Sequence, residues 1–155
     1  MRLVESADIE AGAQAVYARL TDVALGERIA ADRGARLFRP DGGRMLTVGS
    51  DWQAEVPYRG RMRTLTSHVT ALDPPQKIAL AGESGGFAFT LSLTLAPLSR
   101  QATRLWSDLE VRPRTLSARI LLQTLKLGRG RLRARYAQRL AHMAQALQDQ
   151  IAMGG

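Results

Sequence analysis

Few side chains in this sequence are of the types that carry out nucleophilic, acid–base or metal chemistry. The chain has no cysteine, and its two histidines are His68 and His142, which excludes thiolate nucleophiles and gives no basis for a histidine-rich metal site. It contains no Ser-His-Asp order, no pair of carboxylates at catalytic spacing and no HExxH motif. A hydrolase or a metalloenzyme therefore has no support, and we expect neither a metal nor a cofactor.

The polar candidates that remain are isolated residues. Arg63, Glu55 and His68 are the only ionisable residues of the expected strands that merit testing as interior groups. A regular strand places His68 on the face opposite Val69, and therefore towards solvent. Tyr136 lies in an apolar helical pattern, where a buried hydroxyl finds a partner in a backbone carbonyl, at the surface or on a bound ligand.

Size and charge set the class of protein. The chain has 155 residues, 45% of them hydrophobic, and a formal charge of +8. This suits one domain with a real core, residues 1–155, and the absence of a run of about eighteen apolar residues or of a signal-peptide core predicts a soluble, cytoplasmic protein. The charge favours an anionic partner such as nucleic acid, a phospholipid surface or an acidic ligand, or it reflects only a GC-rich coding bias.

Short runs of β-branched and aromatic residues, separated by Gly, Pro and Asp, predict strands over most of the chain before the last helix. Strands are expected at Leu3–Glu10, Ala35–Arg39, Arg44–Val48, Ser50–Tyr58, Arg61–Leu72, Lys77–Ala81, Phe87–Leu95 and Thr103–Arg112. Arg44–Val48 is expected to pair with Ala35–Arg39 across the Asp41-Gly42-Gly43 turn. Two short helices, Ala11–Leu20 and Val23–Ala31, follow the first strand.

The longest helical pattern runs from Thr115 to Ala152 and carries a continuous apolar seam. The seam consists of Leu132, Tyr136, Leu140, Met143, Leu147 and Ile151. Gly128 and Gly130 each cost about 1 kcal/mol relative to alanine in a helix, so they mark either a break between helices Leu116–Leu127 and Arg131–Ala152 or a hinge. A curved antiparallel sheet of about six or seven strands wrapped around this helix buries both apolar surfaces in an α+β fold.

The opposite side of this helical pattern is strongly basic. It carries Arg119, Lys126, Arg129, Arg131, Arg133, Arg135 and Arg139. This face is either simply solvated or makes peripheral contact with an anionic membrane through Arg129 to Arg139. Nucleic acid is disfavoured, because bases are usually engaged by aromatic residues and only Tyr136 is nearby.

Several stretches, in this order, resemble the START-like helix-grip superfamily that includes polyketide cyclases and lipid-transfer domains, also called SRPBCC. The stretches are Ile9–Asp22 (IEAGAQAVYARLTD), Gly49 with Trp52, Tyr58-Arg59-Gly60, Val69–Pro75, and Leu95–Leu98 followed by Thr103–Leu105. Order and spacing carry the resemblance, which covers nearly the whole chain. Two departures are Gly12, where proline is common, and the absence of a tryptophan between Val23 and Asp32.

The resemblance implies a deep, mostly apolar cavity between the curved sheet and the C-terminal helix. Strand parity and helix phase place these residues around it as ligand-binding candidates: Trp52, Val56, Tyr58, Leu65, Phe87, Phe89, Leu91, Leu105, Leu109, Leu125, Leu132, Tyr136 and Leu140. The function expected is non-catalytic binding or transport of a lipid, polyketide, sterol or quinone-like molecule. The alternatives are an enzyme of the polyketide cyclase type and a protein-interaction module of the same fold.

Overall fold

The computed structural model describes residues 1–154, in which the expected alternation of strands and helices appears in the expected order. The elements are β1 (Arg2–Ile9), α1 (Ala13–Leu20), α2 (Val23–Asp32), β2 (Arg36–Phe38), β3 (Asp51–Tyr58), β4 (Arg61–Asp73), β5 (Lys77–Ser84), β6 (Phe87–Ser99), β7 (Ala102–Pro113), α3 (Leu116–Leu127) and α4 (Arg129–Gly154). No helix within these residues is long and apolar enough to cross a membrane.

The strands form one antiparallel seven-stranded sheet in the order β1-β7-β6-β5-β4-β3-β2. Side chains alternate between the two faces of a strand, so the register fixes which residues share a face. Leu91 of β6 lies opposite Leu109 of β7 and Leu80 of β5, and all three point to the side of the sheet that carries α4. We call this side the inner face and the other the outer face.

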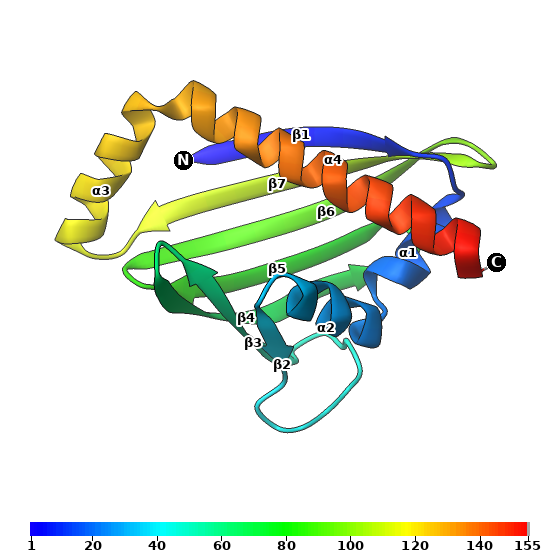
Figure 1. Cartoon of the computed structure of the whole chain (residues 1–155), viewed down its shortest axis with the longest axis horizontal. Coiled ribbons are helices and arrows are strands. Elements are labelled where there is room, and N and C mark those ends of the chain that lie inside the picture. Colours follow the sequence, from blue (N-terminus) through cyan, green and yellow to red (C-terminus); the bar gives the residue numbers. More distant parts are fainter. Residues whose placement is uncertain (155) are drawn as a thin grey trace.

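The helices cover the two ends of the inner face unequally. Helix α4 crosses the sheet diagonally along β1 and β7, while α2 lies at the β2 end (Figure 1). The main packing partners of α4 are β1 and, near the C-terminus, α1. The expected α+β helix-grip architecture, a curved antiparallel sheet holding a long C-terminal helix, is confirmed.

A closed core fills the end of the molecule where α1 and the second half of α4 meet the sheet. It contains Ile9, Ala11, Val16, Tyr17, Ile78, Leu95, Leu105, Leu140, Ala144 and Leu147, all nearly inaccessible to solvent. Leu105 and Val16 are 0% exposed. Burial of a large aliphatic side chain contributes about 1.5–3 kcal/mol, so this cluster is the main source of stability.

The long helical pattern is broken into two helices at Gly128, as one of the two sequence interpretations predicts. Thr115 begins α3, with its side chain accepting a hydrogen bond from the Ala118 amide, and Gly128 ends it at negative φ. Helix α4 then begins at Arg129, so Gly130 lies in its first turn rather than between the helices.

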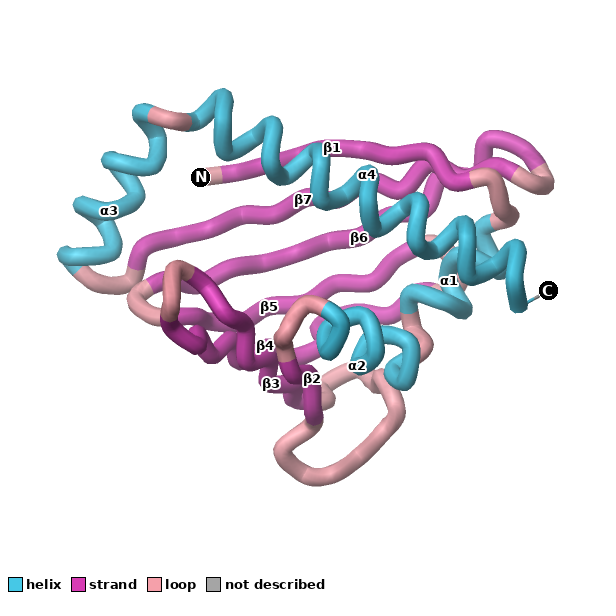
Figure 2. Tube along the Cα trace, in the orientation of Figure 1, coloured by secondary structure: helices cyan, strands magenta, loops and turns pink. Residues whose placement is uncertain are grey.

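The prediction of a strand at Arg44–Val48 is wrong, and the expected hairpin between this segment and residues 35–39 does not form. Instead β2 pairs with β3, and residues 39–50 make a long loop (Figure 2). Side chains replace the ladder: Arg39 donates to both carboxylate oxygens of Asp41 and, at 2.8 Å, to the Met45 carbonyl. The loop is therefore held by a side-chain network, which strand periodicity does not reveal.

Candidate functional site

The inner face carries a continuous set of large apolar side chains from β3 to β7. Phe89 lies opposite Val111, Leu91 opposite Leu109, and Ala54 of β3 opposite Leu65 of β4. Among these residues Phe89, Leu91, Leu109 and Leu65 are only partly buried, although they face the helical side of the sheet. Apolar side chains on a covered face are normally withdrawn from water, so this part of the face is apolar but open.

The predicted site residues divide into four groups by their surroundings. Leu105 and Leu140 belong to the closed core, and Trp52 is 5% exposed. Tyr58 is 48% exposed at the end of the β3–β4 hairpin, with the Arg59 guanidinium beside its ring. The partly buried group consists of Val56, Leu65, Phe87, Phe89, Leu91, Leu109, Leu125, Leu132 and Tyr136.

Two hydroxyl groups meet on this face beneath α4. The Tyr136 hydroxyl and the Ser107 hydroxyl of β7 form a hydrogen bond, and Ser107 is 3% exposed. Burial raises the pKa of Tyr136 above its usual range, against the opposing effect of the Ser107 hydrogen bond. Tyr136 therefore stays protonated at neutral pH and supplies a polar group that can orient a ligand at the edge of the apolar surface.

A charged pair lies next to these hydroxyls and was missed by the sequence analysis. Glu5 of β1 lies opposite Ser107 in the register, and it accepts a hydrogen bond from Arg133 of α4 at 2.9 Å. The inner face is thus not as apolar as expected. The signal was available, because Glu5 occupies the same period-two position as Leu3 and Ile9.

The ionisable strand residues singled out from the sequence lie elsewhere. His68 is exposed on the outer face, as predicted. It lines a hollow of about 540 Å³, together with the outer-face residues Asp51, Gln53, Thr66, Ala81, Glu83, Ala88 and Thr90 and with Trp52 and Phe89 of the inner face. Glu55 also points outward and pairs with Arg36. Arg63 lies opposite Val56 in the register, so it has the inner-face parity, and it is exposed near the start of β4. Neither His68 nor Glu55 shares a face with the Ser107–Tyr136 pair.

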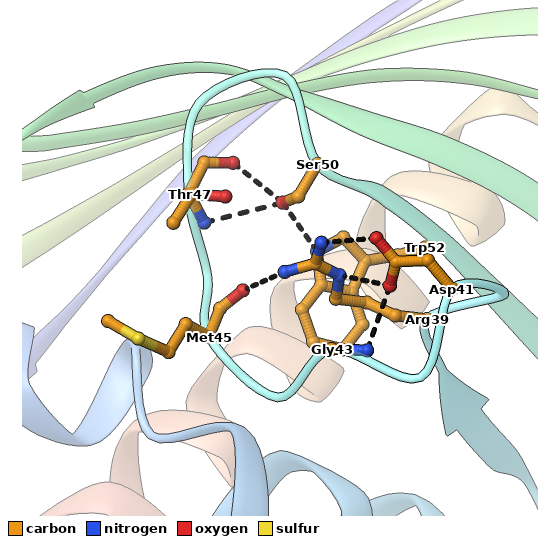
Figure 3. Close-up of polar contacts among 7 residues, drawn as sticks. All are labelled: Arg39, Asp41, Gly43, Met45, Thr47, Ser50 and Trp52. Atoms are coloured by element: carbon orange, nitrogen blue, oxygen red, sulfur yellow. Dashed lines mark hydrogen bonds and ion pairs between the residues drawn. The ribbon is translucent and has the colours of Figure 1, made fainter.

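Trp52 closes one end of the inner face with the help of the long loop. Its indole donates a hydrogen bond to the Ser50 hydroxyl at 3.0 Å, and the Arg39 guanidinium lies 6.0 Å from its ring (Figure 3). A small hollow of about 140 Å³ lies beside it. The hollow is lined mainly by apolar residues of α1, α2, the loop and the sheet, including Leu20, Val23, Leu37, Leu46, Trp52 and Leu80.

A larger hollow of about 760 Å³ opens between α2 and α4. Its walls are formed by Ile29 of α2 and Arg33 at the C-cap of that helix, and by Arg135 and Arg139 of α4, and Val56 of β3 lies at its sheet side. Val56 has the inner-face parity. This hollow therefore reaches the inner face at Val56, and it borders Gly26, which also lines the smaller hollow.

No known family model matches the sequence, and no curated protein matches it. Solved structures do match the fold. A Thermus thermophilus protein superposes with a TM-score of 0.71 at 13% identity, over 100% of this chain and 99% of that one. Norcoclaurine synthase from Thalictrum flavum, in complex with dopamine and hydroxybenzaldehyde, gives 0.67 at 13% identity, over 100% and 88%.

A third similar structure is the Zhui aromatase/cyclase from a Streptomyces species. Its TM-score is 0.66 at 17% identity, over 94% of this chain and 93% of that one. At such identities the likeness concerns the backbone and not the chemistry of the site. The comparisons agree with the architecture described above: the chain has the START-like, SRPBCC-type helix-grip fold.

Proposed function

We propose that this protein binds a hydrophobic small molecule non-covalently on the inner face of its sheet. One observation carries the proposal: Phe89, Leu91 and Leu109 lie on the helix-covered face yet remain partly exposed. A ligand that covered them would gain about 25 cal/mol for each Å² of apolar surface removed from water. The hydroxyls of Ser107 and Tyr136 would orient its polar end.

The comparisons support this proposal at the level of the fold. The norcoclaurine synthase structure holds dopamine and hydroxybenzaldehyde, so a protein of this architecture accommodates small aromatic molecules. Ligand pockets are typically apolar with a few well-placed polar groups, and the partly buried inner face with its hydroxyl pair has this composition.

Titration with the neutral dye Nile red tests the proposal. Replacing Leu91 of β6 with glutamine places an amide on the inner face and is expected to weaken dye binding about tenfold, because burying an unpaired amide costs about 1–3 kcal/mol. The matched control is Leu98→Gln on the same strand, where the side chain is 48% exposed. Equal dye affinity in the two variants would contradict the proposal, as would the absence of any dye binding.

We propose as a second function that α3 docks on an anionic membrane from which such a ligand is collected. Leu116, Ile120 and Leu127 are 72%, 60% and 90% exposed along one side of α3, whereas its opposite side packs through Ala118 and Leu122. Exposed apolar groups of this size mark interaction surfaces.

The charges beside these exposed apolar residues favour an anionic partner. Arg119 and Lys126 flank them, Arg129 follows directly, and within residues 1–154 none of the three forms an ion pair. Apolar side chains flanked by cations are the composition of helices that lie in the interface of anionic bilayers. The sequence-based expectation placed this contact at Arg129 to Arg139, but Arg133 is held by Glu5, so α3 is the better candidate.

Vesicle flotation tests the docking surface. Ile120→Gln combined with Leu127→Gln is expected to abolish binding to phosphatidylglycerol-containing vesicles, since each lost apolar contact weakens insertion. The control pair, Leu98→Gln with Met62→Gln, removes comparably exposed apolar side chains from strands and should float like the natural protein. Equal binding to purely zwitterionic vesicles, or retention of binding by the α3 variant, would refute the docking of α3 on an anionic membrane.

A further inference from the structure

Arginine side chains from α4 and from the residue that follows α2 line the 760 Å³ hollow between these two helices. Arg135, Arg139 and His142 recur at helical spacing on the α4 wall, and Arg33 lies on the α2 side. No acidic residue is among those that line the hollow. Within residues 1–154 none of the three arginines forms an ion pair.

These arginines are exposed, and their mutual repulsion makes the arrangement slightly more favourable when an anion is bound. Like charges four residues apart on a helix, as at Arg135 and Arg139, destabilise it by about 0.2–0.5 kcal/mol, and no protein carboxylate compensates them here. A guanidinium remains charged at all physiological pH values and matches carboxylate or phosphate oxygens in a two-pronged geometry. The hollow thus offers several such donors to one small anion.

The sheet side of the same hollow is apolar. Val56 and Pro57 of β3 and Ile29 of α2 lie beneath the arginines, and Val56 shares the inner face with Leu65 and Phe89. A molecule bound here would therefore meet cations at the surface and hydrocarbon farther in. This polarity belongs to an amphipathic ligand rather than to a free inorganic ion.

We propose that this hollow binds the anionic headgroup, a carboxylate or a phosphate, of an amphipathic ligand whose apolar part lies on the inner face. The inference rests on the proposed ligand-binding function and adds the chemical class of the ligand. Arg135 and Arg139 are the principal headgroup contacts, and Arg33 at the end of α2 lines the same hollow.

A series of probes with the same chain and different headgroups tests this. Dodecanoate and dodecyl phosphate are compared with dodecanol by calorimetric titration, with acetate and inorganic phosphate as headgroups without a tail. Charge-assisted hydrogen bonds from two arginines predict that at least one anion binds about tenfold or more tightly than the alcohol. The ranking of dodecanoate against dodecyl phosphate identifies the headgroup, and tail-less anions should bind far more weakly.

The variant Arg135→Gln with Arg139→Gln should lower the affinity for the anionic probe to that for dodecanol. Its control, Arg28→Gln with Arg131→Gln, removes the same charge from α2 and α4 outside the hollow and should retain the preference. An alcohol bound as well as the anions, or equal losses in both variants, would overturn the headgroup site while leaving the proposed function intact. Absence of binding by all three twelve-carbon probes would overturn both.

Discussion

Leu105 and Leu109 provide a sharp test of the division between a closed core and an open inner face. Both are leucines of β7, both point to the inner face, and the sequence analysis assigned both to the ligand. Leu105 is 0% exposed within the core cluster, whereas Leu109 is only partly buried. Truncating each to alanine therefore removes the same atoms from two different environments.

The expected costs differ by several-fold. At Leu105 the change loses the transfer free energy and leaves a cavity among rigid neighbours, so the free energy of unfolding should fall by about 3–4 kcal/mol, within the usual 2–5 kcal/mol for buried leucine. At Leu109 part of the side chain is already in water and no enclosed cavity forms, so about 1 kcal/mol is expected. In a domain of this size the melting temperatures would fall by about 10 °C and about 3 °C respectively.

Urea unfolding followed by circular dichroism measures the free energy of unfolding of both variants, and Nile red titration measures their affinity for the dye. Leu105→Ala should bind the dye normally under conditions where it is folded, while Leu109→Ala should bind it more weakly. Costs within about 0.5 kcal/mol of each other would refute the division, because they would show that the inner face is packed equally at both positions.

Three further changes test the hydroxyl pair, the loop and the helix break. Tyr136→Phe leaves Ser107 unpaired and should cost about 1–2 kcal/mol at pH 7. The raised pKa of Tyr136 means that the folded state holds the phenol proton more tightly than the unfolded state does. The contribution of Tyr136 to stability is therefore complete below about pH 10 and is lost as the pH rises further. The loss of stability caused by Tyr136→Phe should accordingly become smaller on alkaline titration. Arg39→Ala should speed amide exchange in the loop after β2 about fivefold, the equivalent of about 1 kcal/mol, by hydrogen-exchange mass spectrometry. Replacing Gly128 and Gly130 with alanine should raise thermal stability by about 0.5–1 kcal/mol each while slowing ligand exchange; unchanged exchange kinetics would count against a hinge.

The strand assignments and their faces could be predicted because one large apolar side chain at every second position fixes both. The clearest case is β6, whose register with β7 places Phe87, Phe89, Leu91, Leu93 and Leu95 on the inner face. The same period contained the polar members Glu5 and Ser107. A pattern of large apolar residues gives no signal for a polar residue that occupies the same face, so these two positions were not predicted.

The remaining differences arise from interactions that no local pattern encodes. Residues 39–50 form a loop because Arg39 reaches Asp41 and the Met45 carbonyl, a side-chain network with no periodic signature. Whether an inner-face leucine is closed or open depends on where the helices cross the sheet. Leu105 and Leu109 have the same parity, and only the position of α1 and α4 distinguishes them.

The break at Gly128 explains why one fold contains both a closed and an open region. The second half of α4 packs Leu140, Ala144 and Leu147 against α1 and the sheet, so the stabilising burial is concentrated at that end. Helix α4 begins at Arg129, and α3, which precedes it, points away in another direction (Figure 1). The apolar residues of α3 are therefore divided between the buried Leu122 and the exposed side chains of Leu116, Ile120 and Leu127. A helix continuous through residue 128 could not follow that turn. Stability and the proposed binding thus belong to different ends of the sheet, which is why substitutions on the open side should alter affinity with little loss of folding free energy.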